Sequence, residues 1–306
     1  WSYIFWINVP VGLITILIGE KFLPKDITKT KEKIDFPGFA CIAIAIMTFF
    51  GGIFLGQESG FGSLQSYLLF IIAVIALGLF IMVERKRKSP LIKFAIFKNK
   101  IFTLSLLSAV LIFASNFFVN VVIPFYLQDA RKLSASYAGL LMMVFPLLMV
   151  VGAPLSGYLT DKIGPGILTF GGLLLLCCTS LMYMFLDMNS PIWYYVIATA
   201  IMGLGNALFQ SPNNTMVMSS VEKQDLGVAG SMNSFARNLG MVIGIALSTT
   251  ILYRGMSEAY GERVTTYLAN RPDIFIVGMR ETFFVAFLLC VAAFILTILR
   301  FRKTTK

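Results

Sequence analysis

Nine long hydrophobic stretches, separated by short polar segments, dominate the pattern of this chain. A helix that crosses a bilayer needs about 20 mostly apolar residues, because the backbone must satisfy its own hydrogen bonds in hydrocarbon. The pattern therefore predicts an all-α membrane protein. The predicted transmembrane helices are Tyr3–Gly19, Gly38–Leu55, Tyr67–Val83, Ile101–Leu127, Tyr137–Leu159, Ile167–Leu186, Ile192–Ser211, Leu226–Leu252 and Thr282–Leu299.

The composition excludes a soluble globular protein. Of the 306 residues, 58% are hydrophobic and 13% are charged, and the mean hydropathy is +0.83, whereas a soluble domain carries about 25% charged residues. The sequence has no histidine, which removes histidine metal sites, Ser/His/Asp triads and most enzyme classes. The four cysteines lie in apolar runs without a CxxC pair, so neither a disulfide framework nor a zinc site is expected. We expect neither an enzyme nor a metalloprotein.

The formal net charge of +10 predicts a membrane orientation rather than nucleic-acid binding, because the basic residues lie between the hydrophobic stretches. If the connections alternate between sides, 18 Lys and Arg residues fall on one side, six on the other, and Arg237 within a stretch. The richer side is predicted to be the cytoplasm, which gives a cytoplasmic C-terminus. The first helix then runs inward, so an odd number of helices, consistent with five, is expected before Trp1, and we interpret the chain as a fragment.

Two connections carry further expectations. The basic run within Glu84–Lys100 suits either a positive-inside anchor or binding of anionic lipid or a partner. The anchor is favoured, because the orientation already requires it. The external connection Tyr253–Glu281 contains the apolar run IFIVG, for which a short hairpin or an interfacial helix is expected.

Two predicted helices each carry a polar and aromatic face. Residues three and four apart share one face of a helix, and this spacing joins Asn116, Phe117 and Asn120 on the fourth helix. The seventh helix repeats the pattern with Asn206, Phe209, Gln210, Asn213 and Asn214 around Pro212. Hydrogen bonding between helices explains such residues singly, but several amides in one helix are costly unless they are hydrated. The pair of faces predicts a cavity for an amphiphilic molecule.

Charged residues near the membrane are candidates for gating. Arg237 lies about 15 Å along the eighth helix, where an intramembrane charge indicates function; alternatively this helix begins near Met232 and Arg237 faces a cytoplasmic vestibule. The turn Ser156–Gly166 contains Gly157, Asp161, Lys162 and Gly164, a set that allows close helix approach and a docking contact for Asp161. The predicted spans contain no Asp or Glu, so an acid that carries protons is expected upstream of this chain.

Three segments resemble the fourteen-helix drug:proton antiporter branch (EmrB/QacA type) of the major facilitator superfamily. WSYIFWINVPVG at Trp1–Gly12 is similar to that family's sixth-helix signature, and GYLTDKIGPG at Gly157–Gly166 to the second copy of its GxLaDrxGrr loop. The segment Gly203–Gly240 resembles its twelfth and thirteenth helices, and the resemblance covers the whole chain in order. One departure is that Pro165 and Gly166 stand where the family often has paired bases, which weakens a charge relay beyond Asp161 and Lys162.

The resemblance implies a major facilitator fold with nine of fourteen helices present. Residues 1–20 would be the last helix of the N-terminal bundle, 21–99 the linkers with two extra helices, and 100–306 the C-terminal six-helix bundle. It further implies export by alternating access, driven by the proton gradient without a cofactor, in the plasma (inner) membrane. The expected partners are a drug-like substrate, protons and the lipid bilayer, without nucleic acid, and a periplasmic adaptor if the cell is Gram-negative.

The sequence therefore predicts the C-terminal portion of a multidrug efflux transporter for hydrophobic or cationic compounds. Asn116, Phe117, Asn120, Phe209, Gln210 and Asn213 are predicted to contact the substrate. Asp161 and Lys162, flanked by Gly157 and Gly164, would gate by docking the loop, and Arg237 would tune the inner vestibule. The alternatives are an exporter of one anionic or neutral cargo, such as an antibiotic, siderophore or lipid, and a fragment that does not transport.

Overall fold

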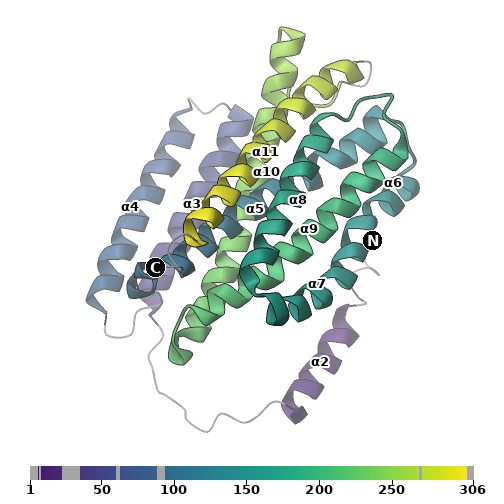
Figure 1. The fold of residues 1–306 in the computed structure, drawn as a ribbon. Helices are drawn as coiled ribbons and strands as arrows, with labels where there is room; N and C mark the ends of the chain where they lie inside the picture. Colours follow the sequence, from purple (N-terminus) through teal and green to yellow (C-terminus); the bar gives the residue numbers. More distant parts are fainter. Residues whose placement is uncertain are drawn as a thin grey trace.

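The computed structural model describes residues 6, 8–22, 35–59, 63–87, 94–268 and 271–301, and these residues form an all-helical protein (Figure 1). Eight of the described helical segments are long and apolar enough to cross a membrane. The helices are α2 (Asn8–Phe22), α3 (Phe36–Ser59), α4 (Leu64–Lys86), α5 (Lys100–Pro124), α6 (Ala135–Met142), α7 (Val144–Ile163), α8 (Pro165–Met184), α9 (Ile192–Ser219), α10 (Leu226–Tyr260) and α11 (Pro272–Phe301). Short η segments at Phe94–Lys98, Phe125–Ala130 and Lys223–Asp225 precede or extend them.

Eight of the nine predicted transmembrane helices are confirmed as long apolar helices in the described residues. The remaining stretch contains α2, which has 15 residues and no buried side chain; the predicted start of this stretch at Tyr3 lies outside the described residues. The fifth predicted helix is divided into α6 and α7, and together these span Ala135–Ile163.

The structure corrects the expectation for the long connection after the eighth helix. The IFIVG run, Ile274–Gly278, forms the first turns of α11 rather than a hairpin or a separate interfacial helix. Helix α10 also continues to Tyr260 and ends at Gly261, whose φ of 86° is a left-handed conformation that suits glycine. Both helices extend beyond the apolar stretch, because charged residues are tolerated where a helix projects past hydrocarbon.

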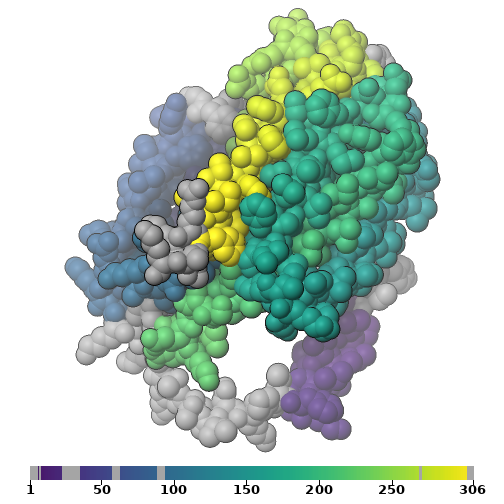
Figure 2. Space-filling model, in the orientation of Figure 1, coloured from purple at the N-terminus to yellow at the C-terminus, as the bar shows by residue number. Residues whose placement is uncertain are grey.

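Helices α5 to α11 form one bundle (Figures 1 and 2). Within it α5 packs on α10 and α11, α8 packs on α9 and α11, and α7 packs on α9. Aromatic side chains such as Phe118, Tyr183 and Phe283 are fully buried at the centre. We call the end where α5 begins and α7 ends the basic end, because Lys98, Lys100 and Lys162 lie there, and the other end the opposite end.

Glycine allows close backbone contact between helices α8 and α9 of the bundle. A Cβ atom at Gly172 of α8 would lie 2.7 Å from the carbonyl oxygen of Gly205 and 2.8 Å from the amide nitrogen of Phe209 on α9. Such distances are shorter than a side chain allows, so the two backbones touch only because position 172 carries no Cβ.

Helices α3 and α4 form a separate hairpin beside the bundle, with α3 nearer to α10 (Figure 1). Along the hairpin the rings of Phe49 and Phe70 meet edge to face, with centroids 5.9 Å apart. At the basic end the Asp35 carboxylate accepts a hydrogen bond from the Gly38 amide at 3.1 Å and pairs with Arg87 Nε at 3.5 Å. This polar contact ties the start of α3 to the end of α4.

Candidate functional site

The centre of the bundle holds a pair of amides that bridge α5 and α9. Asn116 lies midway along α5 and Asn206 midway along α9, and both are buried. Asn116 Nδ2 donates to Asn206 Oδ1 at 2.5 Å, and Asn206 Nδ2 donates to Asn116 Oδ1 at 3.1 Å and to the Met202 carbonyl at 3.0 Å. The two side chains therefore satisfy one another, as the alternative of hydrogen bonding between helices predicts for each residue singly.

A hollow of about 220 Å³ lies next to this pair, between α5, α7 and α9. We call it the central hollow. Asn120, one turn beyond Asn116, is exposed and lines it, with its Nδ2 donating to the Asn116 carbonyl at 3.1 Å. The nine lining residues carry apolar, aromatic, amide or hydroxyl side chains and none is charged: Val119, Asn120, Ile123, Met142, Phe145, Pro146, Tyr195, Thr199 and Met202. An uncharged, mostly apolar lining with a few polar groups is typical of sites for amphiphilic small molecules.

Two hydroxyl residues of α9 at the hollow were not singled out from the sequence. Thr199 donates its hydroxyl hydrogen to the Tyr195 carbonyl at 2.8 Å, and its oxygen lies 2.9 Å from the Tyr183 hydroxyl. Thr199 precedes Asn206 by seven residues and Tyr195 precedes Thr199 by four, which are spacings that mark one face of a helix. Extending the amide face of α9 toward its N-terminus would have found them.

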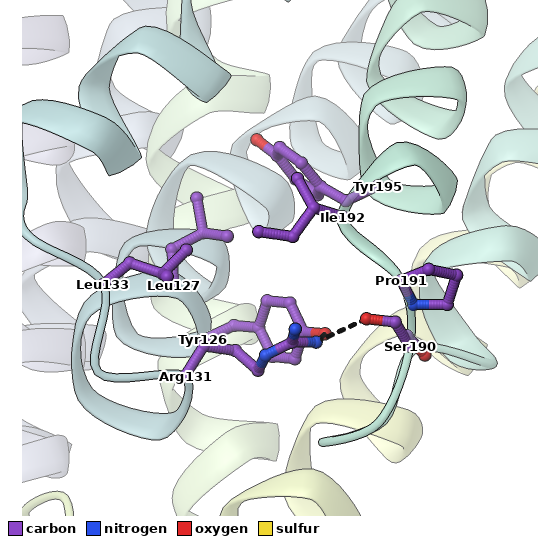
Figure 3. Close-up of a pocket in the computed structure, with 8 residues that line it drawn as sticks. All are labelled: Tyr126, Leu127, Arg131, Leu133, Ser190, Pro191, Ile192 and Tyr195. Atoms are coloured by element: carbon purple, nitrogen blue, oxygen red, sulfur yellow. Dashed lines mark hydrogen bonds between the residues drawn. The ribbon is translucent and has the colours of Figure 1, made fainter.

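Tyr195 also separates the central hollow from the opposite end. It lines a second, very small cavity of about 10 Å³ (Figure 3), which is room for roughly one water molecule. There Arg131 donates to the Ser190 carbonyl at 2.6 Å and to the Tyr126 hydroxyl at 3.1 Å, and Tyr126 donates to the Asp187 carbonyl at 2.7 Å. These bonds fasten the end of α5 to the loop between α8 and α9.

Asn213 lies in a different environment from Asn120. It is almost fully buried and donates to the Ser105 carbonyl at 3.3 Å. Its Oδ1 accepts a hydrogen bond from Arg300 Nη1 at 3.3 Å, and the same nitrogen donates to Ser105 Oγ at 2.8 Å. At 1.5 Å per residue, Asn213 lies about 10 Å from Asn206 toward the basic end, and Asn120 about 6 Å from Asn116 toward the opposite end. The structure therefore does not bring Asn120 and Asn213 to one hollow.

Arg300 is a buried polar residue that the sequence analysis did not select as a candidate, because it lies just beyond the predicted last helix, Thr282–Leu299. It is the last residue but one of α11 and is 3% exposed. The signal that could have found it is the row Ala293, Thr297 and Arg300, which shares one buried face of the helix at spacings of four and three. Arg300, Ser105 and Asn213 together form a polar contact among α11, α5 and α9, which we call the basic-end network.

The remaining predicted contact residues lie at varied depths. Phe209 is buried in the core where α9 meets α8. Phe117 is half-buried beside Gly244 of α10, and Gln210 is half-buried on α9. Their contact with a substrate stays a prediction, and Phe209 and Phe117 also have a packing role between helices.

The predicted gating turn is mostly helical. Helix α7 continues through Asp161 and Lys162 to Ile163, and the reversal takes place at Gly164, whose φ of 84° favours glycine. Asp161 and Lys162 are exposed, and Lys162 Nζ lies 4.5 Å from the centre of the Tyr158 ring. A Cβ at Gly157 would make an ordinary 3.6 Å contact with Ser211 Oγ of α9. Gating by these residues stays a prediction.

Arg237 lies about three turns into α10, because that helix begins at Leu226. The alternative start near Met232 is therefore wrong. Arg237 is half-buried, with Nη2 placed 3.5 Å from the Ser234 hydroxyl, and the neighbouring Asn233 donates to Asn214 of α9 at 2.7 Å. Its role in the vestibule stays a prediction.

The helices and the hollow define a polytopic integral membrane protein of helical-bundle type. The family model of the Major Facilitator Superfamily matches residues 1–245 and 106–306. The chain therefore belongs to the Major Facilitator Superfamily.

Curated relatives carry several names. The chain is 30% identical to the riboflavin transporter RibZ of Clostridioides difficile, over all of this chain and 65% of that protein. It is 27% identical to the multidrug transporter protein MdtP of Bacillus subtilis, over 89% of this chain and 50% of that protein. It is 26% identical to the lincomycin resistance protein LmrB of Listeria monocytogenes, over 91% of this chain and 61% of that protein. The chain thus spans half to two thirds of the length of these relatives.

Proposed function

We propose that this chain is the C-terminal part of a fourteen-helix exporter that moves amphiphilic, hydrophobic or cationic compounds out of the cell in exchange for protons. The observation that carries the proposal is the central hollow, whose lining is uncharged and combines aromatic, thioether, amide and hydroxyl groups. Large flexible and aromatic side chains accept ligands of different shapes. The names of MdtP and LmrB, which refer to multidrug transport and lincomycin resistance, support the same class of cargo.

In this proposal the residues have distinct roles. Asn120 and Tyr195 contact the substrate, and the Asn116–Asn206 pair holds the two helices that carry them at a fixed spacing. Gly157, Asp161, Lys162 and Gly164 act at the basic end during gating, and Arg237 tunes the vestibule. The acids that exchange protons belong to helices upstream of this segment, and the plasma membrane with a cytoplasmic C-terminus is the proposed location.

A second candidate is export of one neutral, planar cargo. The relative RibZ is named a riboflavin transporter, and an uncharged lining with Tyr195, Thr199 and Asn120 can stack on and hydrogen-bond to a heteroaromatic ring system. This candidate requires discrimination between cargoes, whereas the first requires tolerance.

The test uses the full-length protein in inverted vesicles with an imposed pH gradient. Uptake of a fluorescent lipophilic cation is measured for the natural protein, for Asn120→Leu, and for Asn189→Leu as a matched control in an exposed loop. We expect Asn120→Leu to lower uptake about fivefold, since one lost hydrogen bond is worth about 1 kcal/mol, and Asn189→Leu to leave uptake unchanged.

Two results would count against the proposal. Equal uptake by both variants would remove the central hollow from the transport path. Uptake of riboflavin without uptake of the cation would favour the second candidate.

A further inference from the structure

The gap between the α3–α4 hairpin and the bundle is an apolar groove. Its volume is about 620 Å³, and it is enclosed by α3 and α4 on one side and by α5 and α10 on the other. Of its lining residues only Thr103 has a polar side chain, and that hydroxyl already donates to the Phe97 carbonyl at 2.8 Å. The groove therefore offers hydrocarbon contact and no polar group for a hydrophilic ligand.

The groove has the length of a lipid tail within one leaflet. Its lining extends from Ile42 to Phe50 on α3 and from Thr103 to Val110 on α5, which at 1.5 Å per residue is about 12 Å and about 10 Å. One leaflet supplies about 15 Å of the roughly 30 Å hydrocarbon core. The lining residues of α5 and α10 all belong to the half of each helix nearer the basic end, so the groove lies in the leaflet at that end.

Three basic side chains lie beyond the basic end of the groove, where lipid headgroups are expected. Arg85 lies on the same face of α4 as the lining residue Val74, three turns further on, and Lys100 precedes Leu107 by two turns on α5. Lys98 follows the lining residue Phe97 directly. All three bases are exposed, and helical and chain continuity place them beyond the end of the apolar lining.

The acids of the hairpin do not cancel this positive charge at the surface. Asp35 and Glu84 are both buried, and Asp35 is engaged by Arg87 and the Gly38 amide. On the hairpin and α5 side of the groove the exposed described charges at this end are therefore basic, whereas Glu222 and Asp225 precede α10 on the other side. The bases attract an anionic headgroup at roughly 1 kcal/mol per base near the surface.

We propose that this groove is a binding site for one anionic phospholipid, with an acyl chain between the hairpin and α5–α10 and the phosphodiester at Arg85, Lys98 and Lys100. The lipid fills the space that side chains leave between the hairpin and the bundle, and so acts as part of the packing there. The site is separate from the central hollow and does not depend on which cargo is transported.

The experiment is native mass spectrometry of the full-length protein, released from nanodiscs that contain phosphatidylglycerol and phosphatidylcholine in equal amounts. Val74→Trp places an indole in the groove, whereas Val151→Trp makes the same change on α7, outside it; the two valines are both 71% exposed, so neither change disturbs packed core. We expect one phosphatidylglycerol to remain bound to the natural protein and to Val151→Trp, and to be lost from Val74→Trp.

A second pair of variants tests the headgroup. Arg85→Gln with Lys100→Gln should weaken retention of phosphatidylglycerol about thirtyfold, as expected for two bases near the membrane surface, and should leave phosphatidylcholine retention unchanged. Lys162→Gln, an exposed lysine of α7 at the same end, is the control and should retain the lipid.

Equal retention by Val74→Trp and Val151→Trp would overturn the acyl-chain site. Equal retention of both lipids by the natural protein would overturn the anionic headgroup site. Displacement of phosphatidylglycerol by a lipophilic cation at equal concentration would show that the groove holds cargo rather than lipid, and would also overturn the proposal.

Discussion

Helix α5 of the bundle and the α3–α4 hairpin have similar mean hydropathies, 2.3 against 2.3 and 2.8, but they bury different shares of their side chains inside the protein. In the most apolar window of the central helix α5 56% of the residues are buried inside the protein, and in that of α9 50%, against 17% in α3, 22% in α4 and 17% in the bundle segment Ala135–Ile163. A side chain that faces lipid gains little by moving against another helix, since both are hydrocarbon. Hydropathy alone therefore indicates which segments insert into the membrane, whereas side-chain burial indicates which helices form the core of the bundle.

The largest effect should come from the basic-end network of the bundle. Asn213→Leu removes the amide oxygen that accepts from the buried Arg300, and loss of a hydrogen bond to a buried charge costs about 3 kcal/mol. Thermal unfolding of the full-length protein in detergent measures the loss. Thr48→Val in α3, where the hydroxyl bonds only to its own helix at 2.7 Å, should cost under about 1 kcal/mol.

A double variant sharpens this first prediction. Asn213→Leu combined with Arg300→Met replaces both polar partners with apolar groups and should recover part of the lost stability. If the double variant is less stable than Asn213→Leu alone, Arg300 stabilises the bundle through packing rather than through its hydrogen bond to Asn213.

A somewhat smaller loss should follow from adding one methyl group at the contact between α8 and α9. Gly172→Ala places a Cβ 2.7 Å from the Gly205 carbonyl oxygen, and overpacking of this kind costs about 1–3 kcal/mol. The neighbouring Gly171→Ala and the hairpin variant Gly78→Ala add a Cβ with no atom within 4 Å, so both should be neutral or slightly stabilising. Similar losses in all three variants would show that the contact at position 172 does not control the effect.

The ion pair of the hairpin should matter less than either feature of the bundle. Arg87 Nε lies 3.5 Å from Asp35 Oδ1, with the side chain of Arg87 48% exposed and that of Asp35 2% exposed. Solvent screens the arginine and the Gly38 amide remains as a partner of Asp35, so loss of the pair should cost about 1 kcal/mol. Arg87→Gln should therefore change the unfolding temperature slightly, and less at high salt than at low salt. A loss as large as that of Asn213→Leu would erase the distinction between hairpin and bundle.

The smallest effect is expected in the exposed loop between α8 and α9. The Ser190 hydroxyl donates to Asp187 Oδ1 at 2.9 Å, and this bond holds the pKa of that carboxyl below its usual value. A lowered pKa in the folded state adds stability above the ordinary carboxyl range, and this stability is lost as the pH falls through the lowered pKa. Ser190→Ala should reduce the change in unfolding temperature between pH 6 and pH 3, and an unchanged pH dependence would assign it to other groups.

The helices could be predicted because length and hydropathy report insertion directly. Each long apolar stretch from Gly38 onward became a helix, and the amide-rich faces of the fourth and seventh helices do meet, through Asn116 and Asn206. The helix ends were less predictable. The last helix was predicted to begin at Thr282, after the charged pair Arg280 and Glu281, whereas α11 begins at Pro272. Charged residues interrupt the hydropathy pattern without interrupting the helix.

The candidate site was harder to predict, because helical spacing shows which residues share one face of a helix but not which other helix packs against that face. Asn120 lines the central hollow, whereas Asn213, on the matching face of the other helix, meets Ser105 and Arg300. The partner of Asn213 comes from a helix 87 residues further along the chain, and no local pattern encodes that meeting. Thr199 and Tyr195, by contrast, could have been found by continuing the face of α9 from Asn206 by about two and about three turns.

The central claim is that the hollow beside Asn120 is water-filled and takes up cargo, and cysteine labelling tests it most directly. Asn120→Cys is introduced into the full-length protein after its four natural cysteines have been replaced, and a charged, membrane-impermeant thiol reagent is applied in transporting vesicles. If the hollow takes up cargo, we expect the new thiol to react and the transported compound to slow this reaction. A thiol that reacts only with a lipid-soluble reagent, at a rate that the compound does not change, would show that the central hollow is not on the transport path.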